Sequence, residues 1–360
     1  MPKAAKGVVR MARRGAAVFR VATTYIGTVV GAGFASGQET LRFFAAYGPA
    51  GLAGILLATL LFCVLGISAM NLGRRLGAET HREILHHVLG ASLGRIMDGA
   101  ITLFLGITLT VMIAGGGAIF AQQLGAPYAL GTLLTAVVAG ATILAGMRGV
   151  MAANTVVVPL LSLAVLGLVG ASLHHHGLGE VLSALSPHAA LAPARSWWMS
   201  ALLYVSYNLV LALSVLGPLG AEIRDRTALL WGGLLGGLAL GVMAAGMTLA
   251  ISAHLPEAAV EIPMLYLTRF HGPFVQWFYA VVLWAEIYTT AVGCAYGFAG
   301  RLGQAWRYRE AVVASICFAL VGSGFGFSRL LALFYPLFGL VALVVLAGLL
   351  REPLRGVPRG

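Results

Sequence analysis

Long apolar runs alternate along almost the whole chain with short segments that carry charge, glycine, proline or histidine. A helix needs about 20 mostly apolar residues to cross the hydrocarbon core of a bilayer. On that criterion the pattern predicts an all-α membrane protein with ten spans, at 16–47, 50–73, 97–124, 128–147, 153–174, 197–222, 228–253, 271–300, 309–326 and 329–350.

Composition supports a membrane protein and excludes several other classes. Of the 360 residues, 59% are hydrophobic and 10% are charged, whereas about a quarter of a soluble domain is charged. The net charge of +11 would suit a nucleic-acid-binding protein, but the basic residues stand in short clusters between the apolar runs, as topology determinants do. The three cysteines lie within predicted spans without metal-ligand spacing, which is typical of packing residues.

The distribution of Lys and Arg tests the number of spans, because basic residues concentrate on the cytoplasmic side. With ten spans and an inner N-terminus, all but four of the 23 basic residues fall on the inner side. With one span more or fewer, the basic residues would no longer separate into a large inner group and a small outer group. The sequence therefore predicts a membrane domain at 16–350 between cytoplasmic tails at 1–15 and 351–360. An outer segment at 254–270 is expected to cap the external face.

The segment GTVVGAGFASGQE, residues 27–39, places four glycines and a glutamate inside the first predicted span. Each glycine weakens a helix by about 1 kcal/mol relative to alanine, and irregular backbone at membrane depth is tolerated only where protein shields it or where it lines a cavity. We therefore expect a broken helix here. The free amides of such a break attract anions, and its free carbonyls attract cations.

A weak positional symmetry relates the two halves of the chain, about 16–174 and 197–350. The first span of each half is interrupted by polar or glycine residues, which are the glycine-rich segment in one half and YVSYN at 204–208 in the other. Because each half has five spans, the halves must have opposite orientations. Paired discontinuous helices in inverted halves indicate the central site of a secondary transporter.

Glu286 is the sharpest single candidate for a functional residue, because it stands in the middle of the eighth predicted span. A charged side chain at that depth costs about 3 kcal/mol on insertion scales. It is expected to face a cavity or a partner, and Thr289 and Thr290 follow on the same helix. The alternative is a neutral glutamate that is hydrogen-bonded for packing.

The motif YIGTVVGAGFASGQE, residues 25–39, resembles the first helix of the YkvI-type bacterial membrane proteins. More distantly, the ten-span layout is similar to the amino acid, polyamine and organocation (APC) transporter superfamily, whose LeuT-type fold has two inverted repeats of five helices. The resemblance implies a LeuT-like inverted repeat with discontinuous first and sixth helices, in the cell membrane of a bacterium.

LeuT-like transporters carry a G-x-x-V-G-x-G run that Gly27, Val30, Gly31 and Gly33 match. The resemblance implies that the amides of residues 31–34 face a substrate carboxylate. It also implies that the carbonyls of Gly27 and Val30 face a sodium ion beside the eighth span. The residues so assigned to the substrate are Gly31, Ala32, Gly33, Phe34, Tyr204, Ser206, Tyr207 and Asn208.

Coupling by a cation is expected to use Gly27, Val30, Glu286, Thr289 and Thr290, and either Na⁺ or H⁺ fits this set. The family usually has a small residue where Glu286 stands, so Glu286 is expected to be a cation ligand or a proton carrier.

An outer gate that pairs the first and tenth helices by a salt bridge is a further feature of LeuT-type proteins. The resemblance therefore suggests an ion pair of Glu39 with Arg329.

These observations predict a secondary active transporter that moves a small polar organic solute, an amino acid or a related carboxylate, by cation-coupled alternating access. No cofactor, nucleic acid or protein partner is expected beside the solute, the coupling ion and the lipid bilayer. The alternative is a ligand sensor that keeps the transporter fold without turnover. An enzyme is disfavoured because no catalytic constellation stands at one depth, and a channel because no filter-like repeat is present.

Overall fold

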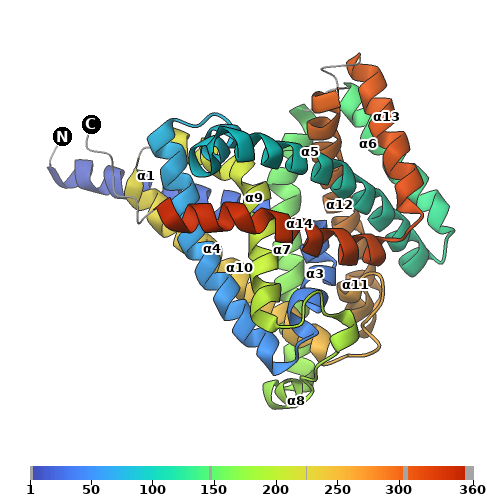
Figure 1. Cartoon of the computed structure of the whole chain (residues 1–360). Helices are drawn as coiled ribbons and strands as arrows, with labels where there is room; N and C mark the ends of the chain where they lie inside the picture. Colours follow the sequence, from blue (N-terminus) through green and yellow to red (C-terminus); the bar gives the residue numbers. More distant parts are fainter. Residues whose placement is uncertain (1–2, 146–147, 224, 303–306, 353–360) are drawn as a thin grey trace.

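The computed structural model describes residues 3–145, 148–223, 225–302 and 307–352, and these residues are helical almost throughout (Figure 1). These ranges contain no regular β-strand. A single isolated β-bridge joins Tyr47 to Pro187. In chain order the helices are α1 (Lys3–Val29), α2 (Ala32–Ala35), α3 (Gln38–Thr40), α4 (Pro49–Leu76), α5 (His81–Leu124), α6 (Tyr128–Ala145), α7 (Arg148–His176), α8 (Leu178–Ser183), α9 (Trp197–Glu222), α10 (Arg226–Ser252), α11 (Pro263–Leu267), α12 (Pro273–Leu302), α13 (Tyr308–Ser323) and α14 (Phe327–Arg351).

In the part of the chain that the structure describes, six helices are long and apolar enough to cross a membrane, namely α4, α5, α9, α10, α12 and α14. Shorter apolar stretches lie at Tyr128–Leu144 and Pro159–His174. Each of these helices overlaps a predicted span, although α5 begins at His81, well before the span predicted at 97–124. The count of ten itself stays a prediction. Helix α1 already begins at Lys3 and so includes most of the expected N-terminal tail, whereas the tail after Glu352 lies outside the described residues.

The first span is broken, as the glycine-rich segment predicts. Helix α1 ends at Val29, and Gly31 is extended, with φ −110° and ψ −177°, before the short helix α2. A second interruption follows at Gly37, whose φ of +84° lies in the left-handed region that favours glycine. The chain then continues through α3 into a π-helical turn, η1 (Leu41–Ala45).

Helix α9 is continuous from Trp197 to Glu222, so the prediction of a discontinuous sixth helix is wrong in this structure. The polar residues at 204–208 act through their side chains instead of by breaking the backbone. Ser206 Oγ donates to Leu203 O and to Gly339 O of α14, and Asn208 Nδ2 donates to Tyr204 O. Polar side chains bonded to carbonyls in this way are compatible with an unbroken helix.

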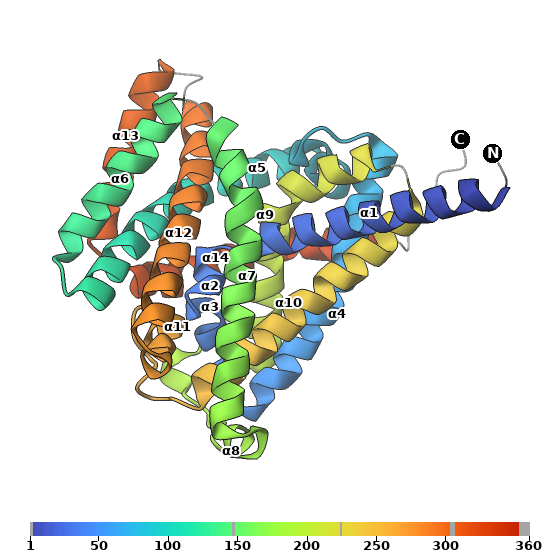
Figure 2. The ribbon, with the colours of Figure 1, turned by 180° about the vertical axis from the view of Figure 1, so that it is seen from behind.

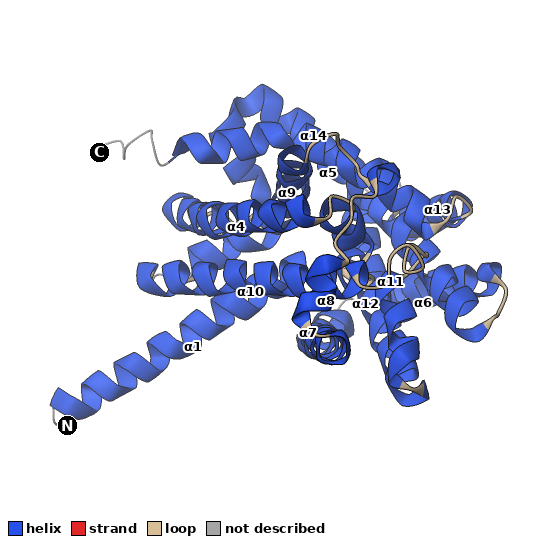
Figure 3. Cartoon of the chain, turned by 90° about the horizontal axis from the view of Figure 1, so that it is seen from below, coloured by secondary structure: helices blue, strands red, loops and turns tan. Residues whose placement is uncertain are grey.

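The helices form two groups that face each other (Figures 2 and 3). Helices α4 and α9 pack together, α1 packs on α10, and α10 packs on α4, whereas α5 holds α6, α12 and α13 on the other side. Helix α7 contacts α10 and α12, and α14 contacts α9 and α5, so both bridge the groups. The broken segment α2–α3 lies between them (Figure 2).

Glycines set the separation of α4 and α9. A Cβ atom at Gly220 of α9 would collide with the main-chain oxygen of Met70 in α4, and one at Gly73 of α4 would collide with that of Gly217 in α9. Neither obstacle is a flexible side chain. The helix axes must therefore move apart if either glycine acquires a side chain.

Gly220→Ala is accordingly expected to lower the melting temperature of the detergent-solubilised protein, with a loss of about 1–3 kcal/mol typical of overpacking. The matched control is Gly167→Ala in α7, where a Cβ would meet no atom within 4 Å. Equal melting temperatures for Gly220→Ala and the wild type would contradict the close contact of α4 with α9.

Candidate functional site

The broken segment of the first span is anchored on three sides and buried. Met264 N of α11 donates to Ser36 O (3.0 Å), and Tyr279 OH of α12 donates to Ala35 O (2.6 Å). Ser36 Oγ donates to Gly33 O (2.8 Å) within the segment itself. Residues 32–40 are all buried as a result, so an irregular backbone at this depth is shielded from lipid by protein.

The left-handed turn at Gly37 directs Glu39 back toward α2. A Cβ atom built on Gly33 would collide with Glu39 Oε1, whereas one on Gly31 would meet nothing within 4 Å. The carboxylate of Glu39 lies beside the side chains of Tyr207 and Asn208 of α9 and is only 4% exposed. The structure thus places Glu39 at the centre of the molecule.

The suggested ion pair of Glu39 with Arg329 is not formed in this structure. Arg329 is exposed at the start of α14, and Glu39 is buried. Among the described residues no salt bridge joins them. The physical reason is the reversal at Gly37, which removes Glu39 from the outer end that a continuous helix would give it.

A cluster of aromatic rings lies on the α9 side of the Glu39 carboxylate. The rings of Tyr204 and Tyr207 lie 5.7 Å apart, and Phe43 lies 5.5 Å from the first and 5.7 Å from the second. Tyr335 of α14 lies 5.1 Å from Tyr207 and close enough to Glu39 to interact electrostatically. Helices α3, α9 and α14 and the turn η1 therefore contribute to one site.

Several polar atoms in this region are buried without a hydrogen-bond partner. They are Glu39 Oε2, Tyr204 OH, Tyr207 OH and, on α5, Thr108 Oγ1. Buried polar atoms are normally paired, since leaving one unpaired costs free energy. A polar ligand bound next to the broken helix could form hydrogen bonds with these unpaired atoms.

Glu286 forms a second buried cluster on α12 with the two threonines that follow it. Thr290 Oγ1 lies 3.5 Å from Glu286 Oε1, and Thr289 Oγ1 donates to Glu286 O (3.1 Å). Glu286 is 3% exposed, and its Oε2 has no partner. The structure buries Glu286 with both threonines beside it, and its role as a cation ligand or proton carrier stays a prediction.

The carbonyl of Gly27 is set free by the break in the first span. Gly31 N donates to Val29 O (3.0 Å) rather than to Gly27 O, which a continuous helix would use. Val30 is buried and Gly27 is half-buried. Helix α12 contacts the broken segment through α2.

The two buried carboxylates have no basic counterpart in the interior. Among the residues whose burial the structure describes, no Lys, Arg or His is buried, while Glu39 and Glu286 are. Glu352, the third buried acid, lies 3.3 Å from His87 Nε2. A buried charge without a partner is strongly disfavoured, so the charge of Glu39 and Glu286 must be neutralised by protons or by bound cations.

A polar seal, which the sequence did not reveal, closes the end of the broken segment that is predicted to face outward. Arg42 Nη2 donates to Ser328 Oγ (2.8 Å), and Ser328 N donates to Glu261 Oε2 (2.7 Å). Gln38 Nε2 donates to Val260 O (2.5 Å). The segment around Glu261 covers this end of the broken helix, and its place on the external face stays a prediction. The one signal for this seal in the sequence was Arg42, which is one of the four basic residues predicted to lie on the outer side.

Arg42→Ala is expected to loosen this outer seal. In a variant without native cysteines, Ala35→Cys should react several-fold faster with a membrane-impermeant thiol reagent once Arg42 is removed, because the contact with Ser328 is lost. Arg269→Ala is the control, since Arg269 stacks over Tyr266 outside the seal. Unchanged labelling after Arg42→Ala would contradict the role of the seal.

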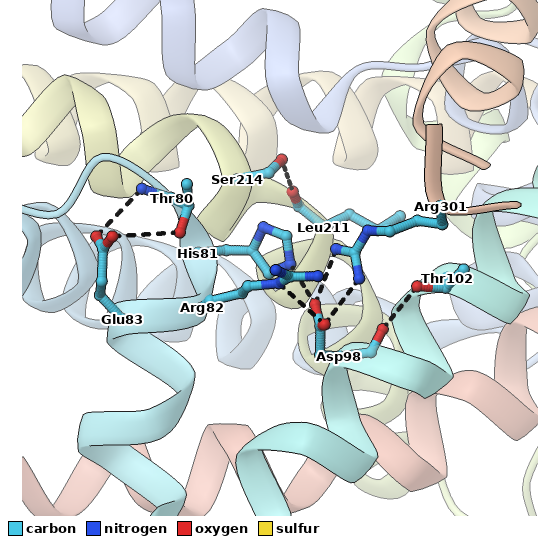
Figure 4. A network of polar contacts seen from close by, with 9 residues as sticks. All are labelled: Thr80, His81, Arg82, Glu83, Asp98, Thr102, Leu211, Ser214 and Arg301. Atoms are coloured by element: carbon cyan, nitrogen blue, oxygen red, sulfur yellow. Dashed lines mark hydrogen bonds and ion pairs between the residues drawn. The ribbon is translucent and has the colours of Figure 1, made fainter. Parts of the chain in front are cut away.

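A second polar network lies on the predicted inner side and centres on Asp98 of α5 (Figure 4). Arg301 of α12 donates two hydrogen bonds to its carboxylate (2.7 and 2.8 Å), and Arg82 donates a third (3.0 Å). His81 Nε2 lies 3.1 Å from the same carboxylate. His81, Arg82 and Arg301 line a cavity of about 460 Å³, so the network joins α5 to α12 beside a hollow.

Asp98→Asn is expected to weaken this network, because it removes the charge that two arginines share. The measurement is the melting temperature, which should fall by several degrees in Asp98→Asn and less in Asp98→Glu. A matched control is Asp225→Asn. Asp225 pairs with Arg14 at the exposed surface, where the guanidinium hydrogen bond lowers the pKa of the carboxyl, and exposed pairs contribute little to stability. An equal fall in both variants would contradict the account.

Sequence comparison identifies two relatives in Bacillus subtilis strain 168. The chain is 32% identical over 335 residues to the membrane protein YkvI, covering 92% of this chain and 94% of that one. It is 29% identical over 341 residues to protein YyaD, covering 91% and 95%. No protein-family model matches the chain.

Solved structures with the same fold are LeuT-like transporters. MhsT in complex with L-phenylalanine superposes with a TM-score of 0.63 at 16% identity, covering 89% of this chain and 87% of that one. The inward-facing conformation of Mhp1 gives 0.59 at 14% identity, with 94% and 78% covered. A substrate-bound, outward-open Na⁺-coupled sialic acid symporter gives 0.60 at 11% identity, with 94% and 90% covered. The chain has a LeuT-like fold.

Proposed function

The chain belongs to the family of the Bacillus subtilis membrane protein YkvI, and we propose that it is a secondary active transporter that moves a small polar organic solute by cation-coupled alternating access. The proposal includes ten spans in two inverted halves, with both termini in the cytoplasm of a bacterial cell. The first turns of α1 and the last turns of α14 lie at the same end of the molecule (Figure 1), which agrees with an even number of crossings.

The observation that carries the proposal is the pair of buried carboxylates. Glu39 and Glu286 lie within a LeuT-like fold, each has an unpartnered oxygen, and no basic side chain whose burial is described lies buried. Ionisable groups inside a membrane protein mark ion or substrate pathways. A protein that must bind cations to neutralise its interior is suited to couple their movement to that of a solute.

In this proposal the coupling ion binds between the first span and α12. Glu286, Thr289 and Thr290 supply oxygen atoms from α12, and the carbonyls of Gly27 and Val30 supply oxygen atoms from the break. Oxygen ligands suit Na⁺, and an isolated carboxylate suits H⁺. The sodium-coupled sialic acid symporter has the same fold, which makes a cation-driven cycle a natural use of this architecture.

The solute in this proposal is an amino acid or a related molecule that lies between the broken segment and α9. Gly31, Ala32, Gly33 and Phe34 form one side of the site, and Tyr204, Ser206, Tyr207 and Asn208 form the other. The structural neighbour MhsT holds L-phenylalanine. The outer gate is the seal of Gln38 and Arg42 with Glu261 and Ser328.

Thermal stabilisation of the purified protein tests the binding part of this proposal. Amino acids, amines and organic acids are added with and without NaCl, at two pH values, and the melting temperature is recorded. We expect at least one solute to raise it, and the shift to depend on sodium or on pH. The absence of any cation dependence for a binding solute would contradict cation coupling.

A further inference from the structure

The hydrogen-bonding capacity of the unpartnered polar atoms at Glu39 suits a ligand that donates hydrogen bonds. Three of them can accept a hydrogen bond, namely Glu39 Oε2, Tyr204 OH and Tyr207 OH, and each phenol can also donate one to the carboxylate. Their residues are each at most 4% exposed. Both tyrosines lie close enough to the Glu39 carboxylate to interact with it electrostatically.

We propose that Glu39 binds the positively charged amino group of the transported solute, and that the solute is therefore an amine or an amino acid and not a simple carboxylic acid. This inference rests on the proposed transport function and deepens it, because it assigns the recognised group and its partner on the protein. It also assigns to Glu39 a position in the binding site instead of a position in the gate.

The hydrogen-bonding capacity of an ammonium group fits the three unpartnered acceptors. A primary ammonium carries three N–H donors and no acceptor. Bound here, it would donate to the carboxylate and to both phenolic oxygens, and it would satisfy three buried atoms in one step. A hydrogen bond to a charged partner is about twice as strong as a neutral one.

The aromatic rings around the carboxylate favour an organic cation over a metal ion. Phe43, Tyr204 and Tyr207 form a cluster with ring centroids 5.5–5.7 Å apart. Aromatic faces attract ammonium groups by cation–π interactions. A metal ion would require further oxygen ligands, and the carbonyls of the continuous helix α9 are committed to its own hydrogen bonds.

The position of Glu39 also disfavours a carboxylate beside Gly33. The space in front of Gly33 is filled by Glu39 Oε1, so the protein supplies its own negative charge where the broken helix would otherwise receive that of the solute. A second carboxylate there would meet like charge in a buried environment, where charges interact more strongly than in water. A carboxylate of an amino acid must lie elsewhere, and Gly31 has open space around it.

The experiment compares ligands that differ only in their charged groups. Three sets share a methyl, an isobutyl or a benzyl group: ethylamine, alanine and propionate; isoamylamine, leucine and 4-methylpentanoate; phenethylamine, phenylalanine and 3-phenylpropionate. Each is titrated against the purified full chain, and the shift in melting temperature gives an apparent affinity. We expect amines or amino acids of at least one set to bind and all three carboxylic acids to fail.

Two variants assign the binding to the Glu39 site. Glu39→Gln keeps the shape of the side chain and should weaken amine binding at least tenfold without lowering the melting temperature of the unliganded protein. Tyr207→Phe keeps the ring, removes one acceptor and should weaken it less. Glu257→Gln, an exposed acid on the outer segment, should bind as the wild type does.

Three outcomes overturn the inference: binding of a carboxylic acid as tight as that of its matched amine, undiminished amine binding in Glu39→Gln, or no binding by any amine or amino acid of the three sets. Uptake into proteoliposomes separates this inference from the proposed function. A carboxylic acid that is bound and accumulated refutes the role of Glu39 and leaves transport standing. An amine that is bound through Glu39 but never accumulated supports the inference and refutes transport.

Discussion

Glu286→Gln is expected to remove the dependence of transport on the coupling cation. The substitution keeps the shape and the hydrogen-bonding length of the side chain but removes its charge. Glu286 is buried, Thr290 Oγ1 lies 3.5 Å from its carboxylate, and no basic side chain of described burial is buried with it. The substitution therefore removes the main electrostatic attraction between the protein and the cation that neutralises Glu286.

The expected size of this effect is large because the charge is intramembrane. We expect at least a tenfold fall in apparent cation affinity, equivalent to about 1.4 kcal/mol, together with a loss of gradient-driven accumulation. Solute binding and the melting temperature should survive, since glutamine is neutral and fills the same space. Glu310→Gln, on the exposed first turn of α13, is the control. Unaltered ion and pH dependence in Glu286→Gln would refute the coupling role.

Gly33→Ala is expected to abolish solute binding without unfolding the protein. The added methyl group would occupy the position of Glu39 Oε1 and displace the carboxylate from the binding site. Gly33 lies within α2 and has no left-handed φ, and alanine favours helix over glycine by about 1 kcal/mol. Loss of binding in this variant therefore cannot be ascribed to backbone strain.

The measurement for Gly33→Ala is again the solute-induced shift in melting temperature. The apparent affinity for the solute, calculated from that shift, should fall at least tenfold. Gly99→Ala in α5 is the matched control, because a Cβ there meets no atom within 4 Å. Wild-type affinity in Gly33→Ala would mean that the Glu39 carboxylate is not part of the site. That result would refute the assignment of Glu39 to the solute-binding site.

The sequence predicted those features that depend on neighbours in the chain. The break after Val29 follows from four glycines in one span, and the Glu286 cluster follows from helical spacing, since residues four apart share a helix face. The predicted spans follow from apolar runs of sufficient length. Each of these properties is decided by the local segment and by the solvent around it.

The features that the sequence did not predict depend on a single dihedral angle or on distant segments. Any of several glycines could have adopted positive φ, and the choice of Gly37 decided that Glu39 points inward. The seal joins Arg42 to Ser328, which are 286 positions apart. In α9 the side chains of Ser206 and Asn208 found carbonyl partners, so polar residues did not require a broken helix.

Gradient-driven uptake tests the central claim most directly. Purified protein is reconstituted into proteoliposomes, a solute found by thermal stabilisation is added outside, and its accumulation is followed under an inward sodium gradient, an inward proton gradient or neither. The account predicts accumulation above equilibrium with one of the two gradients, and none with Glu286→Gln. Saturable binding without uptake, or uptake that is indifferent to both gradients, would contradict it.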